Sequence, residues 1–304
     1  MALEQNIINV LPQSIRPSIR QVSFGGLEEI RLRIGMPVEL IYDVGNKWLL
    51  DTESLSRQAL EEALNYMTGY SIYAMEEELK NGYFTMAGGH RVGVTGRANY
   101  THGTEVLKGM MDIGGLNIRI AHEKKGCAKE ILTFLRKKNG IYNTLLFAPP
   151  GIGKTTYLRD LIRLISTGDE EYGGFKVCVV DERSEIGACI KGRPQNDLGT
   201  RTDVLDGCPK ELGMKMVLRS MSPQIIAVDE LGKNEEFQML LQMRNSGVKV
   251  LGTIHGDNLL ELERIYGKEV LTNFERFIEL CRLSNGKRGF SVYDEKGMKI
   301  WCSF

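Results

Sequence analysis

The sequence predicts an α/β fold in which a mainly parallel β-sheet, covered by helices on both faces, follows a smaller α+β region. Helix-like and strand-like segments alternate between residues 128 and 254, which is the order that a parallel sheet requires. A glycine-rich loop joins one of these strands to the next helix. We therefore expect two domains, at residues 1–123 and 124–304, and a length of 304 residues is sufficient for both.

The first region is predicted to combine helices with short, half-buried strands. Residues 1–20 indicate a short amphipathic helix that ends near Pro17. Ser54 is the expected N-cap of a second helix, because Leu60 and Leu64 follow at helical spacing. Apolar and polar residues alternate in the predicted strands. These strands are residues 27–34, 38–42, 83–86, 91–94 and 116–121.

The second region follows a predicted linker at residues 123–126. Its expected helices are residues 128–138, 156–165, 210–221 and 235–246, and its expected strands are residues 143–148, 176–181, 224–229 and 248–254. Residues 290–301 are typical of a hairpin with Lys296 and Gly297 at its turn. Residues 187–209 are expected to form a long irregular stretch, and loops of this length inside a domain are commonly functional.

Composition excludes several classes of function. The 39 basic residues balance the 39 acidic residues, so the net charge is zero and no nucleic-acid partner is expected. Six scattered cysteines without a C-x-x-C pair favour free thiols in a reducing cytosol, and three of them, Cys178, Cys189 and Cys281, lie in or beside apolar segments. Glu4 argues against a signal peptide, and no apolar run approaches the roughly 20 residues that a membrane span needs.

The most informative motif is the loop between the predicted strand 143–148 and the next helix. It reads Ala148-Pro-Pro-Gly-Ile-Gly-Lys-Thr155, which matches G-x-x-x-x-G-K-[ST] except that Ala148 replaces the first glycine. Gly151 and Gly153 allow successive N–H groups to converge on phosphate oxygens. Lys154 adds a charge for the β- and γ-phosphates, and Thr155 adds a hydroxyl for Mg²⁺. The expected nucleotide-binding residues are Ala148, Pro149, Pro150, Gly151, Ile152, Gly153, Lys154, Thr155 and Thr156.

Two carboxylates follow the buried strand Ile-Ile-Ala-Val that begins at Ile225. Ligands of such sheets lie outside the carboxyl ends of the strands, so Asp229 and Glu230 are expected beside the glycine-rich loop. Asp229 is the candidate that holds Mg²⁺ through water, together with Thr155. Glu230 is the candidate catalytic residue that orients or deprotonates the attacking water.

Two further groups end strands of the same sheet. Asp181, Glu182 and Glu185 follow the strand 176–181 and are candidates for supporting Mg²⁺ or for positioning water. The alternative interpretation is a solvated loop in which Arg183 neutralises part of the acidic charge. His255 ends the strand 248–254 and suits a γ-phosphate sensor, because its ring can donate or accept at neutral pH. A satisfied structural histidine is the alternative there.

The order of these motifs resembles that of the secretion ATPases of type II and type IV systems. The matching order is the phosphate loop, V-V-D-E at residues 179–182, the strand that ends in Asp229-Glu230, and G-T-I-H-G at residues 252–256. A closer resemblance, from about residue 26 to the end of the sheet, is to the stage III AA family of sporulation proteins. That resemblance rests on residues 30–37, 90–97, 117–121, 193–209 and 218–223.

The resemblance implies a RecA-like, AAA-type ATPase domain that uses ATP and Mg²⁺. It also implies a homo-oligomeric ring, a hexamer, with nucleotide between subunits or between the two domains. By position, Glu230 becomes the catalytic carboxylate of the Walker B motif, Asp181 and Glu182 fall in the Asp box, and His255 in the His box. Secretion ATPases usually have Gly at the position of Asp229, which leaves open which carboxylate handles Mg²⁺. Their four-cysteine motif is absent, so no zinc is expected.

Five arginines are candidates to complete the site of a neighbouring subunit. A cation delivered to the γ-phosphate stabilises the charge of the transition state. The alternative for any single one is a surface or packing role. They are Arg91, Arg97, Arg119, Arg201 and Arg219. We also expect residues 187–209 to face the ring axis or the subunit boundary.

The leading functional interpretation is a Mg²⁺-dependent ATPase of the secretion type that energises or assembles the channel complex between mother cell and forespore. By resemblance, the chain is expected in the mother-cell cytoplasm, docked on membrane proteins of that complex and without a span of its own. One alternative is a nucleic-acid-handling AAA+ or RecA-like ATPase, against which the balanced charge argues. The other is a nucleotide-binding scaffold without significant hydrolysis, against which the combination of Lys154, Asp229 and Glu230 argues.

Overall fold

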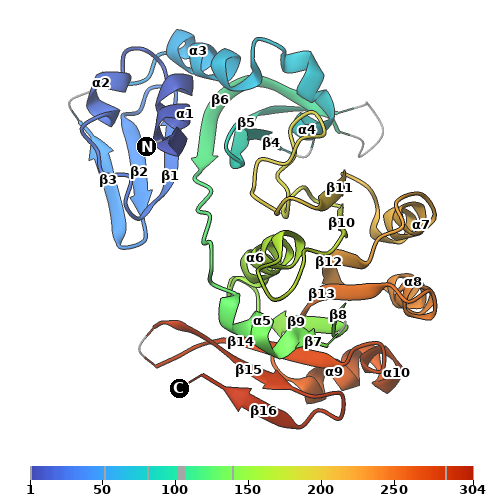
Figure 1. Cartoon of the computed structure of the whole chain (residues 1–304). Coiled ribbons are helices and arrows are strands. Elements are labelled where there is room, and N and C mark those ends of the chain that lie inside the picture. The colour runs from blue at the N-terminus through green and yellow to red at the C-terminus, as the bar shows by residue number, and fades with distance from the viewer. Residues whose placement is uncertain are drawn as a thin grey trace. The chain divides into compact units, whose positions relative to one another are not determined.

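The computed structural model describes residues 2–50, 53–80, 82–100, 107–138, 140–284 and 286–303. The chain divides into two compact units, Met1–His122 and Glu123–Phe304, each built on its own large sheet (Figure 1). The first unit is α+β, and the second is α/β with a mainly parallel sheet, so the predicted fold class is confirmed. No helix in the described ranges is both long and apolar enough to cross a bilayer.

The first unit is a six-stranded antiparallel sheet in the order β3-β2-β1-β6-β5-β4. Its apolar face, with the fully buried Leu27, Ile30 and Leu32 of β1, packs in one core with helices that include α1 and α3. The strands are β1 Leu27–Arg33, β2 Val38–Tyr42, β3 Gly45–Leu49, β4 Tyr83–Met86, β5 His90–Tyr100 and β6 Leu107–Arg119. The helices are α1 Ala2–Val10, α2 Arg16–Ile19, α3 Arg57–Thr68, the 3₁₀ helix η1 Ile72–Met75 and α4 Glu76–Lys80.

The structure corrects several predictions for this unit. Residues 1–20 form two helices, because Pro17 lies in the first turn of α2, where its missing N–H is not needed. Ser56, not Ser54, caps α3 by accepting a hydrogen bond from the N–H of Ala59. The polar segment β3 lacks an apolar alternation and was missed; it is an edge strand held by pairing with β2.

The second unit is an eight-stranded sheet in the order β11-β10-β12-β13-β9-β14-β15-β16. Neighbours from β11 to β14 run parallel, and β15 and β16 close the sheet in antiparallel pairs. The strands are β9 Thr144–Ala148, β10 Val177–Asp181, β11 Thr202–Asp206, β12 Ile225–Leu231, β13 Lys249–His255, β14 Arg276–Arg282, β15 Arg288–Tyr293 and β16 Lys299–Cys302. A small ribbon pairs β7 Arg136–Lys137 with β8 Gly140–Ile141.

Helices cover both faces of this sheet, as predicted. Figure 1 shows α6 on one side of the central strands and α7 and α8 on the other. Leu146 of β9 packs with α5 and α6, whereas Leu145 and Phe147 pack with α7, α8 and α9, so the strand is buried on both faces. The helices are α5 Lys129–Leu135, α6 Lys154–Thr167, α7 Lys210–Ser220, α8 Asn234–Asn245, α9 Leu259–Tyr266 and α10 Lys268–Leu271.

The predicted elements of the second unit occur with small shifts and three larger differences. The helix expected over 128–138 ends at Leu135, because the next two residues pair in β7. Residues 187–209 are not wholly irregular: β11 pairs in parallel with β10. The segment that contains α9, α10 and β14 was not predicted. The hairpin of β15 and β16 is confirmed, and its turn is closed by the Asp294 carboxylate, which accepts from the N–H groups of Lys296 and Met298.

Candidate nucleotide-binding site

The loop between β9 and α6 has the backbone conformation that a phosphate-binding loop needs. Gly151 and Gly153 have φ angles of +78° and +108°, which L side chains rarely adopt. Helix α6 begins directly at Lys154, and no side chain of the described residues caps its N-terminus. The first N–H groups of the helix and the positive end of its dipole therefore face the loop, which favours an anion there.

Lys154 is buried at the mouth of this loop. Its Nζ atom donates hydrogen bonds to the carbonyl oxygens of Ala148 at 2.9 Å and Pro149 at 3.2 Å, and to Nδ1 of His255 at 2.9 Å. Burial lowers the pKa of Lys154, although the charges of Asp229 and Glu230 oppose that shift. The ammonium group is thus held within reach of the loop by acceptors that a polyphosphate can replace.

Thr155 and Asp229 meet at the same edge of the sheet. The Thr155 hydroxyl donates to Oδ2 of Asp229 at 2.6 Å, and the Thr253 hydroxyl contacts Oδ1 of the same carboxylate. A hydroxyl and a carboxylate are ligands that suit Mg²⁺, which keeps several waters and takes further oxygens from substrate phosphates. The described residues contain no group of three or more His, Cys, Asp or Glu that could hold a metal ion.

Glu230 lies in a β-bulge of β12. The register with β13 shifts between Val228 and Leu231, and Glu230 has a φ of +51°, a conformation that costs roughly 1–3 kcal/mol in a non-glycine residue. The Thr253 hydroxyl accepts a hydrogen bond from the Glu230 N–H at 2.8 Å. The bulge places two consecutive carboxylates, Asp229 and Glu230, at one sheet edge, which a regular strand would direct to opposite faces.

His255 connects the phosphate-loop lysine to this carboxylate. Lys154 can only donate, so Nδ1 of His255 accepts, and Nε2 then carries the proton and donates to Oε1 of Glu230 at 3.0 Å. The Arg183 guanidinium pairs with the other oxygen of Glu230 at 2.5 Å. Burial acts to raise the pKa of Glu230, but the His255 hydrogen bond and the Arg183 charge outweigh it and lower the pKa. Glu230 is therefore ionised at neutral pH, which suits a residue that orients water.

The predicted supporting acids organise the loop after β10. Both oxygens of Asp181 are used, because they accept the N–H groups of Glu185 at 2.9 Å, Ile186 at 2.9 Å and Gly187 at 2.8 Å. Glu182 pairs with the Lys210 ammonium at 3.1 Å, and the Glu185 carbonyl accepts from Arg159 at 2.7 Å. A role for these acids in holding Mg²⁺ or water stays a prediction.

Residues 1–300 match the sequence profile of the family described as sporulation stage III, protein AA. The chain belongs to this family. It is 41% identical over 300 residues to the stage III sporulation protein AA of Bacillus subtilis (strain 168), which covers 96% of this chain and 95% of that protein. The sporulation resemblance inferred from the sequence is confirmed.

Solved structures of secretion-type ATPases share the fold of this family member. The pilus retraction motor PilT with bound ADP aligns with a TM-score of 0.64 and 18% identity, over 93% of this chain and 82% of that one. The ATPase DotB of Legionella pneumophila aligns with a TM-score of 0.58 and 17% identity, over 88% and 77%. At these identities the likeness establishes the fold, which is that of the RecA-like secretion ATPases.

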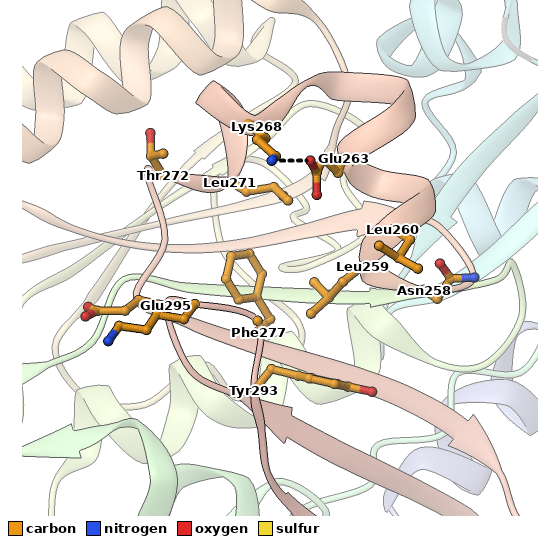
Figure 2. Close-up of a pocket in the computed structure, with 12 residues that line it drawn as sticks. Asn258, Leu259, Leu260, Glu263, Lys268, Leu271, Thr272, Phe277, Tyr293 and Glu295 are labelled. Carbon is orange, nitrogen blue, oxygen red and sulfur yellow. Dashed lines mark ion pairs between the residues drawn. The ribbon is translucent and has the colours of Figure 1, made fainter.

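A pocket of about 540 Å³ in this chain lies apart from the phosphate loop. Figure 2 shows its lining, in which Leu259, Phe277 and Tyr293 face one another beneath the ion pair between Lys268 and Glu263. The lining comes from α9, α10, β14 and the β15–β16 turn, and it includes no residue of the phosphate loop or of the two acidic strand ends. Its apolar walls do not match a polyphosphate.

Four residues of the site have roles that sequence reasoning did not predict. Lys210 donates to the Glu230 carbonyl at 2.8 Å and Arg159 donates to the carbonyls of Ile186 and Glu185, so both fix the loops around the acids. Thr253 fixes Asp229, and Arg183 pairs with Glu230 rather than with its sequence neighbours. No local pattern marks these residues, because each partner lies 20 or more residues away in the sequence.

The five candidate arginines fall in both units. Arg91, Arg97 and Arg119 belong to β5 and β6 of the first unit, where Arg91 stacks on the ring of Tyr83 at 3.8 Å. The other two, Arg201 before β11 and Arg219 in α7, lie in the second unit and are exposed. Their action on a neighbouring subunit stays a prediction.

We expect Asp181 to titrate near pH 6. Burial raises its pKa from 3.8 to about 6, although three backbone N–H groups oppose the shift. The folded state therefore holds this proton more tightly than the unfolded chain, so the proton stabilises the fold fully below pH ~4 and loses its effect as the pH rises through about 6. The loss amounts to about 3 kcal/mol.

The measurement is the difference in unfolding free energy between the wild type and Asp181→Asn as a function of pH. Between pH 4 and pH 6.5, the unfolding free energy of Asp181→Asn should rise relative to that of the wild type. Asp203→Asn, an exposed position on β11, is the matched control and should show no such trend. A pH-independent difference for Asp181→Asn would contradict the assignment.

Proposed function

We propose that this chain is a Mg²⁺-dependent ATPase of the secretion type. The observation that carries the proposal is the meeting of two side-chain pairs at one sheet edge. Thr155 donates to Asp229, and His255 bridges Lys154 to Glu230. Metal-holding oxygens, a phosphate-binding cation and a water-orienting carboxylate are the three parts that phosphoryl transfer to water requires.

Catalysis in this proposal depends on positioning and on charge. The N–H groups of the loop and of α6 bind the phosphates, and Lys154 neutralises charge at the β- and γ-phosphates. Thr155 and Asp229 would hold Mg²⁺, which would supply positive charge next to the phosphate oxygens. Glu230 orients the attacking water in line with the γ-phosphate. His255 holds the Glu230 carboxylate through its hydrogen bond, while its other ring nitrogen accepts from Lys154.

The cellular role that we propose follows from the family. Hydrolysis would energise or assemble the channel complex between mother cell and forespore, with the chain in the mother-cell cytoplasm and docked on membrane proteins. A homo-oligomeric ring, proposed as a hexamer, would bring arginines of one subunit to the nucleotide of the next. The fold shared with a pilus retraction motor and with DotB supports this proposal.

A second candidate is a nucleotide-binding switch with little hydrolysis. The Arg183 ion pair favours it, because a cation 2.5 Å from Glu230 competes with the water that this carboxylate would orient. The pair is weakly held, since the Arg183 side chain is 61% exposed, and exposed pairs contribute little. We therefore place it second.

Phosphate release from ATP by the purified full chain tests the proposal. The ATPase predicts release that requires Mg²⁺ and stops with EDTA. The switch predicts ATP binding with no release above the Glu230→Gln background. Absence of both binding and release would overturn both candidates.

A further inference from the structure

Arg288 lies against the phosphate loop in the same subunit. A Cβ atom added to Gly153 would stand 2.8 Å from Nη1, 3.0 Å from Cζ and 3.3 Å from Nη2 of Arg288, so the guanidinium rests on the Cα of this glycine. Arg288 begins β15, which pairs with β14 of the same sheet. A strand far along the sequence thus brings a cation to the loop whose N–H groups converge on phosphate.

No anionic partner of the described chain accounts for this cation. Arg288 is half-buried, and its side chain makes no hydrogen bond or ion pair with another residue of the part that the structure describes. Its charge acts on Cys127 and Tyr157, where it counters the effect of burial, which raises the pKa of both groups. Neither of these neutral groups compensates a guanidinium.

A like charge stands directly opposite Arg288 in the sheet. Arg282, the last residue of β14, is its cross-strand partner, and like charges at such positions are destabilising. A half-buried guanidinium beside another cation becomes favourable when an anion binds. The guanidinium contacts such a site, because Gly153 belongs to the phosphate loop and the N-terminus of α6 beside it is uncapped.

We propose that Arg288 binds the α- and β-phosphates of the nucleotide in its own subunit. The proposal rests on nucleotide binding at the β9–α6 loop. N–H groups of such loops cradle the α- and β-phosphates, whereas Lys154 reaches the β- and γ-phosphates. A cation that contacts Gly153 is therefore placed at the α- and β-phosphates. The guanidinium fork suits two phosphate oxygens at once.

This position gives Arg288 a different task from an arginine supplied by a neighbour. ADP and ATP share the α- and β-phosphates, so the contact stabilises both complexes alike and does not strengthen in the transition state. It should therefore act on affinity rather than on turnover. The same contact requires glycine at position 153, because any larger side chain there would overlap the Arg288 guanidinium.

The test is equilibrium binding of ATP, ADP and adenosine to the full chain, with pyrophosphate as a competitor. Arg288→Ala should weaken ATP and ADP by about tenfold or more and pyrophosphate in parallel, since one charge-assisted contact is lost. Adenosine binding should not change. Turnover at saturating ATP should stay within roughly threefold of the wild type. Arg288→Lys should recover part of the affinity, and Arg264→Ala, an exposed position on α9, is the matched control with wild-type affinity.

Three outcomes would overturn the inference. One is an Arg288→Ala variant that binds ADP as the wild type does while Lys154→Ala loses binding. Another is an equal loss for adenosine, which would place Arg288 on the base. The third is a loss of turnover at unchanged affinity. If the wild type itself binds no nucleotide, the proposed function fails first, and thermal unfolding of Arg288→Ala and Arg288→Lys identifies any loss caused by misfolding.

Discussion

Glu230→Gln is expected to bind ATP with nearly wild-type affinity and to hydrolyse it at least about 100-fold more slowly. Glutamine keeps the size of the side chain and can still accept from Nε2 of His255. It loses the charge that orients and polarises the attacking water. The ATP complex should therefore accumulate, which single-turnover phosphate release and nucleotide retention both measure.

The matched control is Glu235→Gln, an exposed position in the first turn of α8, which should behave as the wild type. The left-handed backbone at Glu230 allows a second test, which is whether the variant keeps its stability. This backbone conformation persists because Thr253 and His255 hold it, so Glu230→Gln should unfold at the wild-type temperature. Wild-type turnover by Glu230→Gln would remove this residue from its assigned role.

Lys154→Ala is expected to weaken ATP binding by about 100-fold and to abolish turnover. Its Nζ atom is the cation at the mouth of the loop, and charge-assisted hydrogen bonds to phosphate are among the strong ones. Loss of the ammonium also frees Nδ1 of His255, so the bridge to Glu230 loses its second anchor. Titration with a fluorescent ATP analogue measures the affinity.

Because Lys154 is buried, packing must be separated from charge. Lys154→Met keeps the apolar stem and should lose as much affinity as Lys154→Ala while unfolding at a temperature closer to the wild type. Lys176→Ala, an exposed position before β10, should bind normally. Wild-type affinity in Lys154→Met would move the nucleotide away from this loop.

The parts of the site that sequence predicted are those encoded within a few residues. Strand β9, the two glycines and Lys154 are close together in the sequence. The apolar run Ile225–Val228 predicts the strand that carries Asp229. The bulge at Glu230 was not predictable, because it arises from the register between β12 and β13. The same holds for the ion pair of Arg183 with Glu230 and for the contact of Arg288 with Gly153, which depend on the folding of segments far apart in the sequence.

Misplaced helix boundaries have a similar origin. Ser54 and Ser56 are both suitable caps, and it is the Ser56 hydroxyl that accepts from the N–H of Ala59 in the first turn of α3. Strand β11 carries few apolar residues, so its pairing with β10, not its own pattern, makes it a strand. Local propensity thus identified most of the elements that bury apolar faces, although α9 and β14 were missed. It also missed β3 and β11, which depend on pairing with a neighbour.

The central claim is that the β9–α6 loop and the two acids near the carboxyl end of β12, Asp229 and Glu230, form a hydrolytic ATP site. The most direct measurement is Mg²⁺-ATP hydrolysis per chain over a wide range of protein concentrations, with Glu230→Gln as the background. We predict activity above that background, with a specific rate that rises with concentration as neighbouring subunits complete the site. Hydrolysis no faster than Glu230→Gln at every concentration would contradict the account.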